Sequence, residues 1–238
     1  MIPGRVLAAT LLLLLSAAAS SRDFIPSIGD DLHELFSRDP LIVMGVGASV
    51  TGVSFCLESA RGNPGFLGDG FLHSAAEVSH HTMGLPLLGA SAALWGAGSL
   101  WDSPETEETG QMLTEGLLLT YGFTGILKLG VGRERPDGSN SRSFPSAHAA
   151  GTACSAVILW DRYGAGAGIP AAAVSIFTAV SRVHLGQHYP SDVIAGAAIG
   201  VSLGLAVTRA HGEGANSPYV HPALGIRWSS ENGFGVYF

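Results

Sequence analysis

Long apolar stretches alternate with short polar connections over most of this chain. The connections are rich in Gly, Pro, Asn and Asp, as in Arg61–Gly65 and Pro136–Asn140, which is typical of loops. Each apolar stretch has the length of a helix, and none shows the alternation of a strand. The pattern predicts a single all-α body at residues 41–210, a bundle of six helices at about 41–57, 83–101, 112–130, 147–160, 169–183 and 191–209.

The residues before this body predict a different kind of helix. From Asp23 to Phe36, apolar residues recur at helical spacing, which predicts a short amphipathic helix in an N-terminal segment at residues 20–40. Such a helix is suited to lying along a membrane surface.

The C-terminal tail, residues 211–238, predicts a short β-hairpin. Pro222–Trp228 and Phe234–Phe238 read as strands on either side of a Ser-Ser-Glu-Asn-Gly turn. An aromatic last residue is also found in outer-membrane barrel proteins, but two strands cannot close a barrel. We therefore expect a peripheral hairpin.

The first 19 residues predict a secretory signal peptide. Arg5 precedes an apolar run from Val6 to Leu15, and the small residues Ser16–Ser20 follow, matching the charged, apolar and cleavage regions of such peptides. The run is shorter than the roughly 20 apolar residues of a spanning helix, which favours cleavage near Ala19 over a retained anchor. We expect an exported protein of the cell envelope, membrane-associated or periplasmic.

Composition narrows the classes of partner. Charged residues make up 13% of the chain, against about 25% in an average globular protein. So few charges favour contact with lipid, although 33 glycines are also compatible with a soluble bundle. The net charge of −7 argues against a nucleic-acid partner, because proteins that bind nucleic acids carry basic patches. Cys56 and Cys154 lie in apolar helical stretches, which favours buried free thiols over a disulfide or a metal pair.

Three short polar runs in the second half of the chain carry the candidate chemistry. They are Lys128–Pro136, Pro145–His148 and Ser181–Asp192, and they hold long cationic side chains, histidines and a carboxylate. Positive charge suits phosphate oxygens, one imidazole can attack phosphorus, and another can protonate the leaving group, so this inventory predicts covalent phosphoryl transfer. The runs lie at ends of predicted helices, with Ser146 as the expected N-cap of the fourth helix and Asp192 in the opening turn of the sixth. In an up-and-down bundle their connections fall at the same end.

These runs resemble the signature of the type 2 phosphatidic acid phosphatase (PAP2) superfamily, whose fold is shared with vanadium haloperoxidases. The signature reads K-x6-R-P, P-S-G-H and S-R-x5-H-x3-D. The chain departs from it at Ala147, where the family usually has Gly; Ala keeps the backbone N–H but adds a methyl group. The resemblance covers roughly residues 83–209 and implies a six-helix PAP2/haloperoxidase-like bundle.

The resemblance also implies a role for each residue that fits the signature. His188 would attack phosphorus and form a phosphohistidine, Asp192 would orient its imidazole, and His148 would act as the general acid. The phosphate-binding residues would be Lys128, Arg135, Arg182, Ser146 and Ala147. The three cations would take the place of a metal ion, so no metal or other cofactor is implied.

Several other polar residues have less specific interpretations. Arg133 and Arg142 are either solvated or part of an electropositive mouth, and the sequence does not favour one over the other. The acidic run from Asp102 to Glu108 predicts a solvated loop at the opposite end of the bundle. The remaining histidines that lie near helix ends or in the tail, His80, His81, His184, His211 and His221, are expected to be structural.

The substrate that we expect is a phosphomonoester or diphosphate on a lipid, such as phosphatidic acid, a polyprenyl diphosphate or a lipid A headgroup. The alternatives are a soluble exported acid phosphatase of broad specificity acting on small phosphoesters, a vanadate-dependent haloperoxidase, and a non-catalytic lipid-binding bundle. If the first three helices of the body all span a membrane, the site and the processed N-terminus lie on opposite sides. Lys and Arg are too few to show a positive-inside bias.

Overall fold

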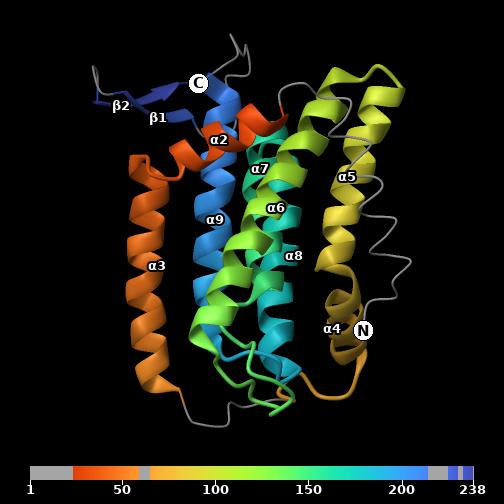
Figure 1. The fold of residues 1–238 in the computed structure, drawn as a ribbon, viewed down its shortest axis with the longest axis vertical. Helices are drawn as coiled ribbons and strands as arrows, with labels where there is room; N and C mark the ends of the chain where they lie inside the picture. Colours follow the sequence, from red (N-terminus) through yellow and green to blue (C-terminus); the bar gives the residue numbers. More distant parts are fainter. Residues whose placement is uncertain (1–23, 59–64, 214–224, 230–232, 238) are drawn as a thin grey trace.

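The fold is a bundle of helices, described here from a computed structural model that covers residues 24–58, 65–213, 225–229 and 233–237 (Figure 1). The predicted helical fold is confirmed. The helices are α2 (Phe24–Glu34), α3 (Arg38–Leu57), α4 (Phe71–Thr82), α5 (Leu85–Leu100), α6 (Pro104–Val131), α7 (Ala147–Tyr163), α8 (Ala165–His184) and α9 (Pro190–Glu213).

The helix count of the body differs from the predicted six. Each predicted stretch contains a helix, but the described residues also include α4, whose sequence FLHSAAEVSHHT has no continuous apolar run. Gly84 separates α4 from α5, and the two helices meet at an angle of 60°. The break at Gly84 lies beside His148, since a Cβ atom on Gly84 would be 3.0 Å from His148 Nε2, and α4 packs beside α8.

Helices α6, α7 and α9 form the centre of the bundle. One core cluster joins them through Met112, Cys154, Ile158 and Val207. The approach of α9 to α7 is close because α9 carries small residues: a Cβ atom on Gly196 would lie 2.3 Å from the carbonyl oxygen of Ser146. Helix α3 flanks this centre on the side of α9, and the α4–α5 pair flanks it on the other side (Figure 1).

The flanking helices expose apolar side chains. Val46, Val53 and Phe55 on α3 are each more than half exposed, as is Ile176 on α8. Among the described residues, three helices are long and apolar enough to cross a membrane, namely Arg38–Leu57, Ala165–His184 and Pro190–Gly212, and the bent α4–α5 pair is a fourth candidate. This apolar surface indicates membrane association.

The helix that was expected in the N-terminal segment is present as α2. Helix α2 lies across one end of the bundle, and the C-terminal ends of α6 and α8 lie at the other end (Figure 1). Leu35 packs into the bundle, whereas Leu32 and Phe36 are 43% and 73% exposed. Among the described side chains of α2, the fully buried one is polar, Asp31. The predicted signal peptide at residues 1–19 lies outside the described residues.

Two expectations about other segments are wrong. Residues 102–108 are not a solvated loop, because α6 already begins at Pro104 and Glu108 forms an ion pair of 2.8 Å with Arg162. Cys56 is exposed on α3, which has neighbours on only one face, whereas Cys154 is buried in the core as expected.

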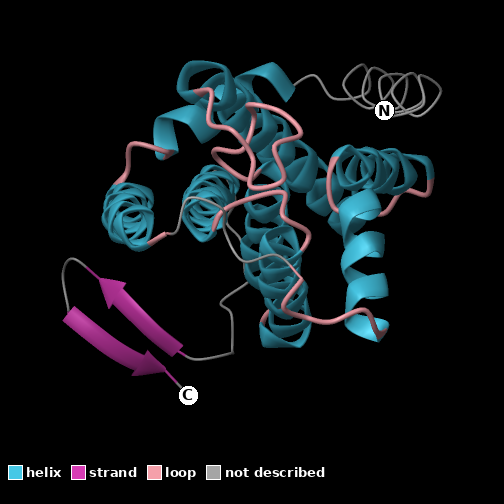
Figure 2. Cartoon of the chain, turned by 90° about the horizontal axis from the view of Figure 1, so that it is seen from below, coloured by secondary structure: helices cyan, strands magenta, loops and turns pink. Residues whose placement is uncertain are grey.

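The C-terminal tail contains two strands, β1 (Gly225–Ser229) and β2 (Gly233–Tyr237). They pair antiparallel, with Gly225 opposite Tyr237 and Ser229 opposite Gly233 (Figure 2). Of the predicted turn at residues 229–233, Ser229 and Gly233 belong to the strands, and residues 230–232 lie outside the described residues.

Candidate active site

The three polar runs meet at one end of the bundle, where the loops after α6 and α8 lie together (Figure 2). The end of α6 is marked by Gly132, which has a left-handed conformation with φ of 61°. Two backbone hydrogen bonds join the runs: Asp137 N donates to Gly186 O at 3.1 Å, and Ser146 N donates to Asp192 O at 2.9 Å. Chain order and helix direction therefore bring the eight predicted site residues to the same end.

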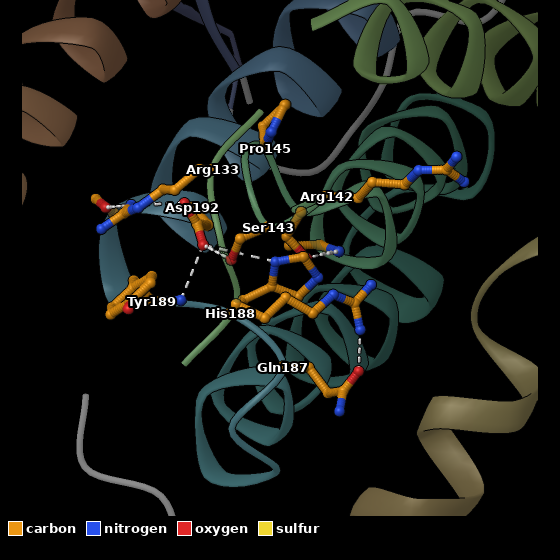
Figure 3. A network of polar contacts seen from close by, with 12 residues as sticks. Arg133, Arg142, Ser143, Pro145, Gln187, His188, Tyr189 and Asp192 are labelled. Atoms are coloured by element: carbon orange, nitrogen blue, oxygen red, sulfur yellow. Dashed lines mark hydrogen bonds and ion pairs between the residues drawn. The ribbon is translucent and has the colours of Figure 1, made fainter. Parts of the chain in front are cut away.

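Asp192 is buried in the first turn of α9 beside His188 (Figure 3). Its Oδ2 accepts hydrogen bonds from the Ser143 hydroxyl and from the Tyr189 N–H, the latter at 2.9 Å. His188 Nδ1 lies 3.7 Å from the same oxygen, beyond hydrogen-bond distance, and has no other partner. The carboxylate is held firmly, and the imidazole is oriented toward it without a short hydrogen bond.

Arg133 turns out to be neither solvated nor part of a mouth. Its Nη1 donates to Asp192 Oδ1 and its Nη2 to Glu58 Oε2, at 2.7 and 2.8 Å. Its guanidinium also stacks on the rings of Tyr189 and Phe55, at 3.9 and 4.7 Å from the ring centroids. Arg133 therefore acts as a structural cation that neutralises and fixes Asp192, with Glu58 as its counter-ion.

Glu58 also tethers α3 to α9. Its Oε2 accepts from the Ser191 hydroxyl at 2.9 Å, and its Oε1 accepts from the Ser191 N–H, one of the free donors at the start of α9. Sequence reasoning missed Glu58, Ser143 and Ser191. The only signal for Glu58 was an isolated acidic residue at the end of an apolar stretch.

The three predicted phosphate-binding cations make different contacts. Lys128 Nζ donates to backbone carbonyls of the loop before α7, including Arg142 O at 2.9 Å and Pro145 O. Arg135 Nη1 donates to the Gln187 side chain, and Arg182, only 1% exposed, contacts His80 through Nη1. The Nε atoms of Arg135 and Arg182 are buried and have no hydrogen-bond partner.

These cations share one electrostatic environment with His188. Burial, together with the positive charges of Lys128, Arg182 and Arg135, lowers the pKa of His188 to about 4, although Asp192 opposes this shift. Burial and the neighbouring Arg135 likewise lower the pKa of Lys128 to about 8. The imidazole is therefore neutral at physiological pH and surrounded by positive charge, which suits a nucleophile that meets a phosphate.

His148 lies in the first turn of α7, behind the predicted N-cap. Ser146 Oγ accepts a hydrogen bond from Ala149 N at 3.4 Å, which confirms that Ser146 caps the helix. His148 Nε2 lies 3.1 Å from the carbonyl oxygen of His80, and the two rings stack with centroids 5.9 Å apart. Burial and Arg182 lower the pKa of His148 to about 3.

The stacking identifies a residue whose importance the sequence did not indicate. His80 was expected to be structural, yet it contacts both His148 and Arg182 from α4. His184, by contrast, holds a loop as expected: its Nδ1 accepts from Leu67 N at 3.1 Å, and its Nε2 lies 3.0 Å from His73 Nδ1. Of the described residues, the one group arranged to hold a metal ion is Asp31, Glu115 and His211, which is at the other end of the bundle.

Comparison with known proteins relates the chain to phosphatases. The family model of the PAP2 superfamily matches residues 112–214, which include all eight predicted site residues. Decaprenylphosphoryl-5-phosphoribose phosphatase of Mycobacterium tuberculosis is 33% identical over 151 residues, 58% of this chain and 79% of that protein. The corresponding protein of Mycolicibacterium smegmatis is 35% identical over 140 residues, 53% of this chain and 72% of that protein.

Two further similarities complete the comparison. Lipid A 1-phosphatase of Porphyromonas gingivalis is 30% identical over 145 residues, 58% of this chain but only 31% of that longer protein. A transmembrane PAP2 type phosphatidylglycerolphosphate phosphatase from Bacillus subtilis has a solved structure that superimposes with a TM-score of 0.47 and 21% identity, over 89% of this chain and 98% of that one.

Proposed function

We propose that this chain, which belongs to the PAP2 superfamily and is a phosphoric ester hydrolase of that type, removes phosphate from a lipid through a phosphohistidine and without a metal ion. The observation that carries the proposal is a set of unpaired donors. The Nε atoms of Arg135 and Arg182 are buried without acceptors, and both cations act electrostatically on His188. An anion supplies the acceptors that these donors lack.

His188 is the nucleophile in this mechanism. Its Nδ1 faces Asp192 at 3.7 Å, which leaves Nε2 free to attack phosphorus. The new P–N bond forms as the bond from phosphorus to the leaving oxygen breaks, and His148 gives that oxygen a proton. Asp192 stabilises the positive charge that His188 acquires, as a carboxylate does for other catalytic histidines.

Water completes the cycle. A water molecule gives a proton to His148 and attacks phosphorus, and the P–N bond breaks with its electron pair returning to His188. The phosphate oxygens are held throughout by Lys128, Arg135 and Arg182. The hydroxyl of Ser146 and the N–H of Ala147 add the donors of the α7 N-terminus, where the helix dipole also favours an anion.

An apolar cavity beside the site supports a lipid substrate. It has a volume of about 720 Å³ and lies between α3, α6 and α9, lined by residues that include Phe55, Leu127 and Phe144. Phe55 stacks on Arg133. Leu127 directly precedes Lys128, and Phe144 directly follows Ser143. The cavity therefore adjoins the site and suits a hydrocarbon chain attached to the phosphate.

The membrane is the proposed location of the protein, within the cell envelope. The candidate spanning helices and the exposed apolar side chains of α3 support this placement. A substrate with a hydrocarbon chain would then reach the cavity sideways from the lipid, past Phe55 of α3, which lines the cavity and is 57% exposed.

Phosphate release by the detergent-purified chain tests this function. We expect kcat/KM for micellar phosphatidic acid to exceed that for a hexose phosphate by at least about tenfold, since one bound hydrocarbon chain contributes several CH₂ groups at roughly 0.8 kcal/mol each. EDTA should leave the activity intact, vanadate should inhibit it, and His188→Gln should abolish it. Near-normal activity of His188→Gln would rule out the mechanism.

A pair of variants tests the cavity separately. Gly52 lines the cavity, and a side chain there meets nothing within 4 Å at its Cβ position, so Gly52→Leu fills the cavity without a clash. It should lower kcat/KM for the lipid more than for the hexose phosphate. Gly45→Leu, on the same helix, outside the cavity lining and equally open, is the matched control. Equal effects of Gly52→Leu on both substrates would contradict the lipid site.

A further inference from the structure

A second cluster of reactive side chains lies at the end of the bundle opposite the active site, where α2 crosses the central helices (Figure 1). Asp31 of α2, Glu115 of α6 and His211 of α9 place one ligand atom each within 4.8 Å of the others. Asp31 and Glu115 are fully buried, and the His211 side chain is 14% exposed. Three helices thus contribute one metal-ligating residue each to one point.

Glu115 and His211 are already tied together. His211 Nε2 lies 2.8 Å from Glu115 Oε2, and the Ser27 hydroxyl donates to the same oxygen at 3.0 Å. The Gln111 amide donates to the other carboxylate oxygen at 2.8 Å. The Gln111 contact orients Glu115 in the way that neighbouring donors orient metal-binding carboxylates.

Asp31 is different, because neither of its carboxylate oxygens has a hydrogen-bond partner although the residue is fully buried. An unpaired carboxylate is among the most costly groups to bury. Glu115, the second carboxylate of the cluster, is fully buried as well. Among the described residues, His211 offers at most one positive charge to two carboxylates, so the cluster is at least one positive charge short.

We propose that Asp31, Glu115 and His211 bind a divalent metal ion, zinc by the nature of the ligands, and that this ion fastens α2 to the bundle. One imidazole nitrogen and two carboxylate oxygens form a ligand set that zinc accepts, with a fourth position left for the Ser27 hydroxyl or water. Zinc–ligand distances of about 2.0–2.2 Å place tetrahedral ligand atoms roughly 3.4 Å apart. The three ligand atoms lie within 4.8 Å of one another, so binding requires only local adjustment, including separation of the His211–Glu115 pair.

A metal clamp has a clear structural purpose at this position. Helix α2 has only 11 residues and would not be stable alone. Its apolar anchors are few: Phe24 packs on Trp95 with ring centroids 5.2 Å apart, and Leu35 joins the cluster with Leu203. The ion would strengthen the attachment of α2 to the bundle, which these contacts provide only weakly. It would lie at the end of the bundle opposite His188.

Zinc binding to the tag-free, full-length chain in detergent tests the proposal. After dialysis against EDTA, Zn²⁺ titration should give one saturable site per chain by calorimetry, confirmed by metal analysis. A zinc concentration 100-fold above Kd should raise Tm by at least about 4 °C. Phosphatase activity well below Tm should be the same with and without zinc, because the ion is not at the active site.

Variants decide whether these three residues form the site. Asp31→Asn and His211→Gln should each lose the zinc-dependent rise in Tm. Asp30→Asn should keep it, because Asp30 is the exposed neighbour of Asp31. If Asp31→Asn does not fold, His211→Gln and the absorption spectrum of bound Co²⁺, which reports imidazole and carboxylate ligation, provide the readout. The absence of a saturable site in the natural chain, or unchanged affinity in His211→Gln, overturns the proposal.

Discussion

Arg133 holds Asp192 from the side opposite His188, and Glu58 holds Arg133 in turn. We expect Arg133→Gln to lower kcat by about 10- to 100-fold with a smaller change in KM, as loss of a ligand-orienting partner does at other sites. The reason is that an unpaired Asp192 can rotate away from His188. Steady-state kinetics with an aryl phosphate measures the split between kcat and KM.

Arg142→Gln is the matched control for Arg133→Gln. Arg142 is exposed and contributes its carbonyl group, not its guanidinium, to the contact with Lys128. We expect kcat and KM of Arg142→Gln to stay within about twofold of the values of the natural chain. Equal losses in the two variants would show that positive charge at this end matters and that the contact with Asp192 does not.

The second prediction at the residue scale concerns the pH dependence that His148 gives to the reaction. The lowered pKa values of His148 and His188, about 3 and about 4, leave both imidazoles neutral as pH rises above 5. The neutral form makes His188 a competent nucleophile, but it leaves His148 without the proton that a general acid donates. We therefore expect kcat/KM for an alkyl phosphate to fall as pH rises from 5 to 8. An aryl phosphate, whose leaving group needs no proton, should show a flatter profile.

The variant His148→Gln separates this effect from titration of the substrate. It should remove most of the pH dependence with the alkyl phosphate and retain more activity toward the aryl phosphate than toward the alkyl one. The same steep profile in His148→Gln as in the natural chain would mean that another group supplies the proton.

At the scale of elements, the contact of α7 with α9 positions the anion-binding end of α7. A Cβ atom on Gly196 would lie 2.3 Å from Ser146 O, so Gly196→Ala must push the N-terminus of α7 away from Asp192. We expect a loss of about 1–3 kcal/mol in unfolding free energy and a lower kcat. Thermal unfolding and kinetics on the same preparation measure both.

Gly122→Ala is the corresponding control on α6. Gly122 is exposed and has nothing within 4 Å of its Cβ position, so alanine there should leave kcat unchanged and stabilise the helix by up to about 1 kcal/mol. A Gly196→Ala protein with natural stability and kcat would show that the two helices separate at little cost.

At the scale of the whole molecule, α2 and the candidate site lie at opposite ends of the bundle (Figure 1). If the bundle spans a membrane, single cysteines at Gly29→Cys and Ser139→Cys must react from opposite sides. Both positions are exposed, and the background needs only Cys56→Ser because Cys154 is buried. Labelling of intact cells with an impermeant maleimide should modify one cysteine, and permeabilised cells should show both.

Modification of both cysteines in intact cells would contradict a spanning bundle. Protection of both in intact cells would do so equally. The side from which Ser139→Cys reacts also identifies the compartment of the active site. The arrangement of the helices alone does not fix that compartment, because it depends on the orientation of the N-terminal segment.

Much of the site followed from the sequence because its residues lie within a few positions of helix ends. The apolar stretches predict where α6 and α8 end and where α7 and α9 begin, and alternating helix direction then brings Lys128, His148 and His188 to one end. Both the capping role of Ser146 and the placement of Asp192 in the first turn of α9 were predicted correctly, since a cap needs only local geometry.

Contacts between distant segments were decided only by the tertiary structure. Glu58 and Arg133 are 75 positions apart, and Asp31 and Glu115 are 84 apart, so no local pattern shows that they meet. Helix α4 escaped prediction because it is short and polar and is stabilised by packing beside α8, which also brings His80 to His148. Local periodicity determines which segments form helices, whereas the pairing of buried charges depends on which helix faces meet.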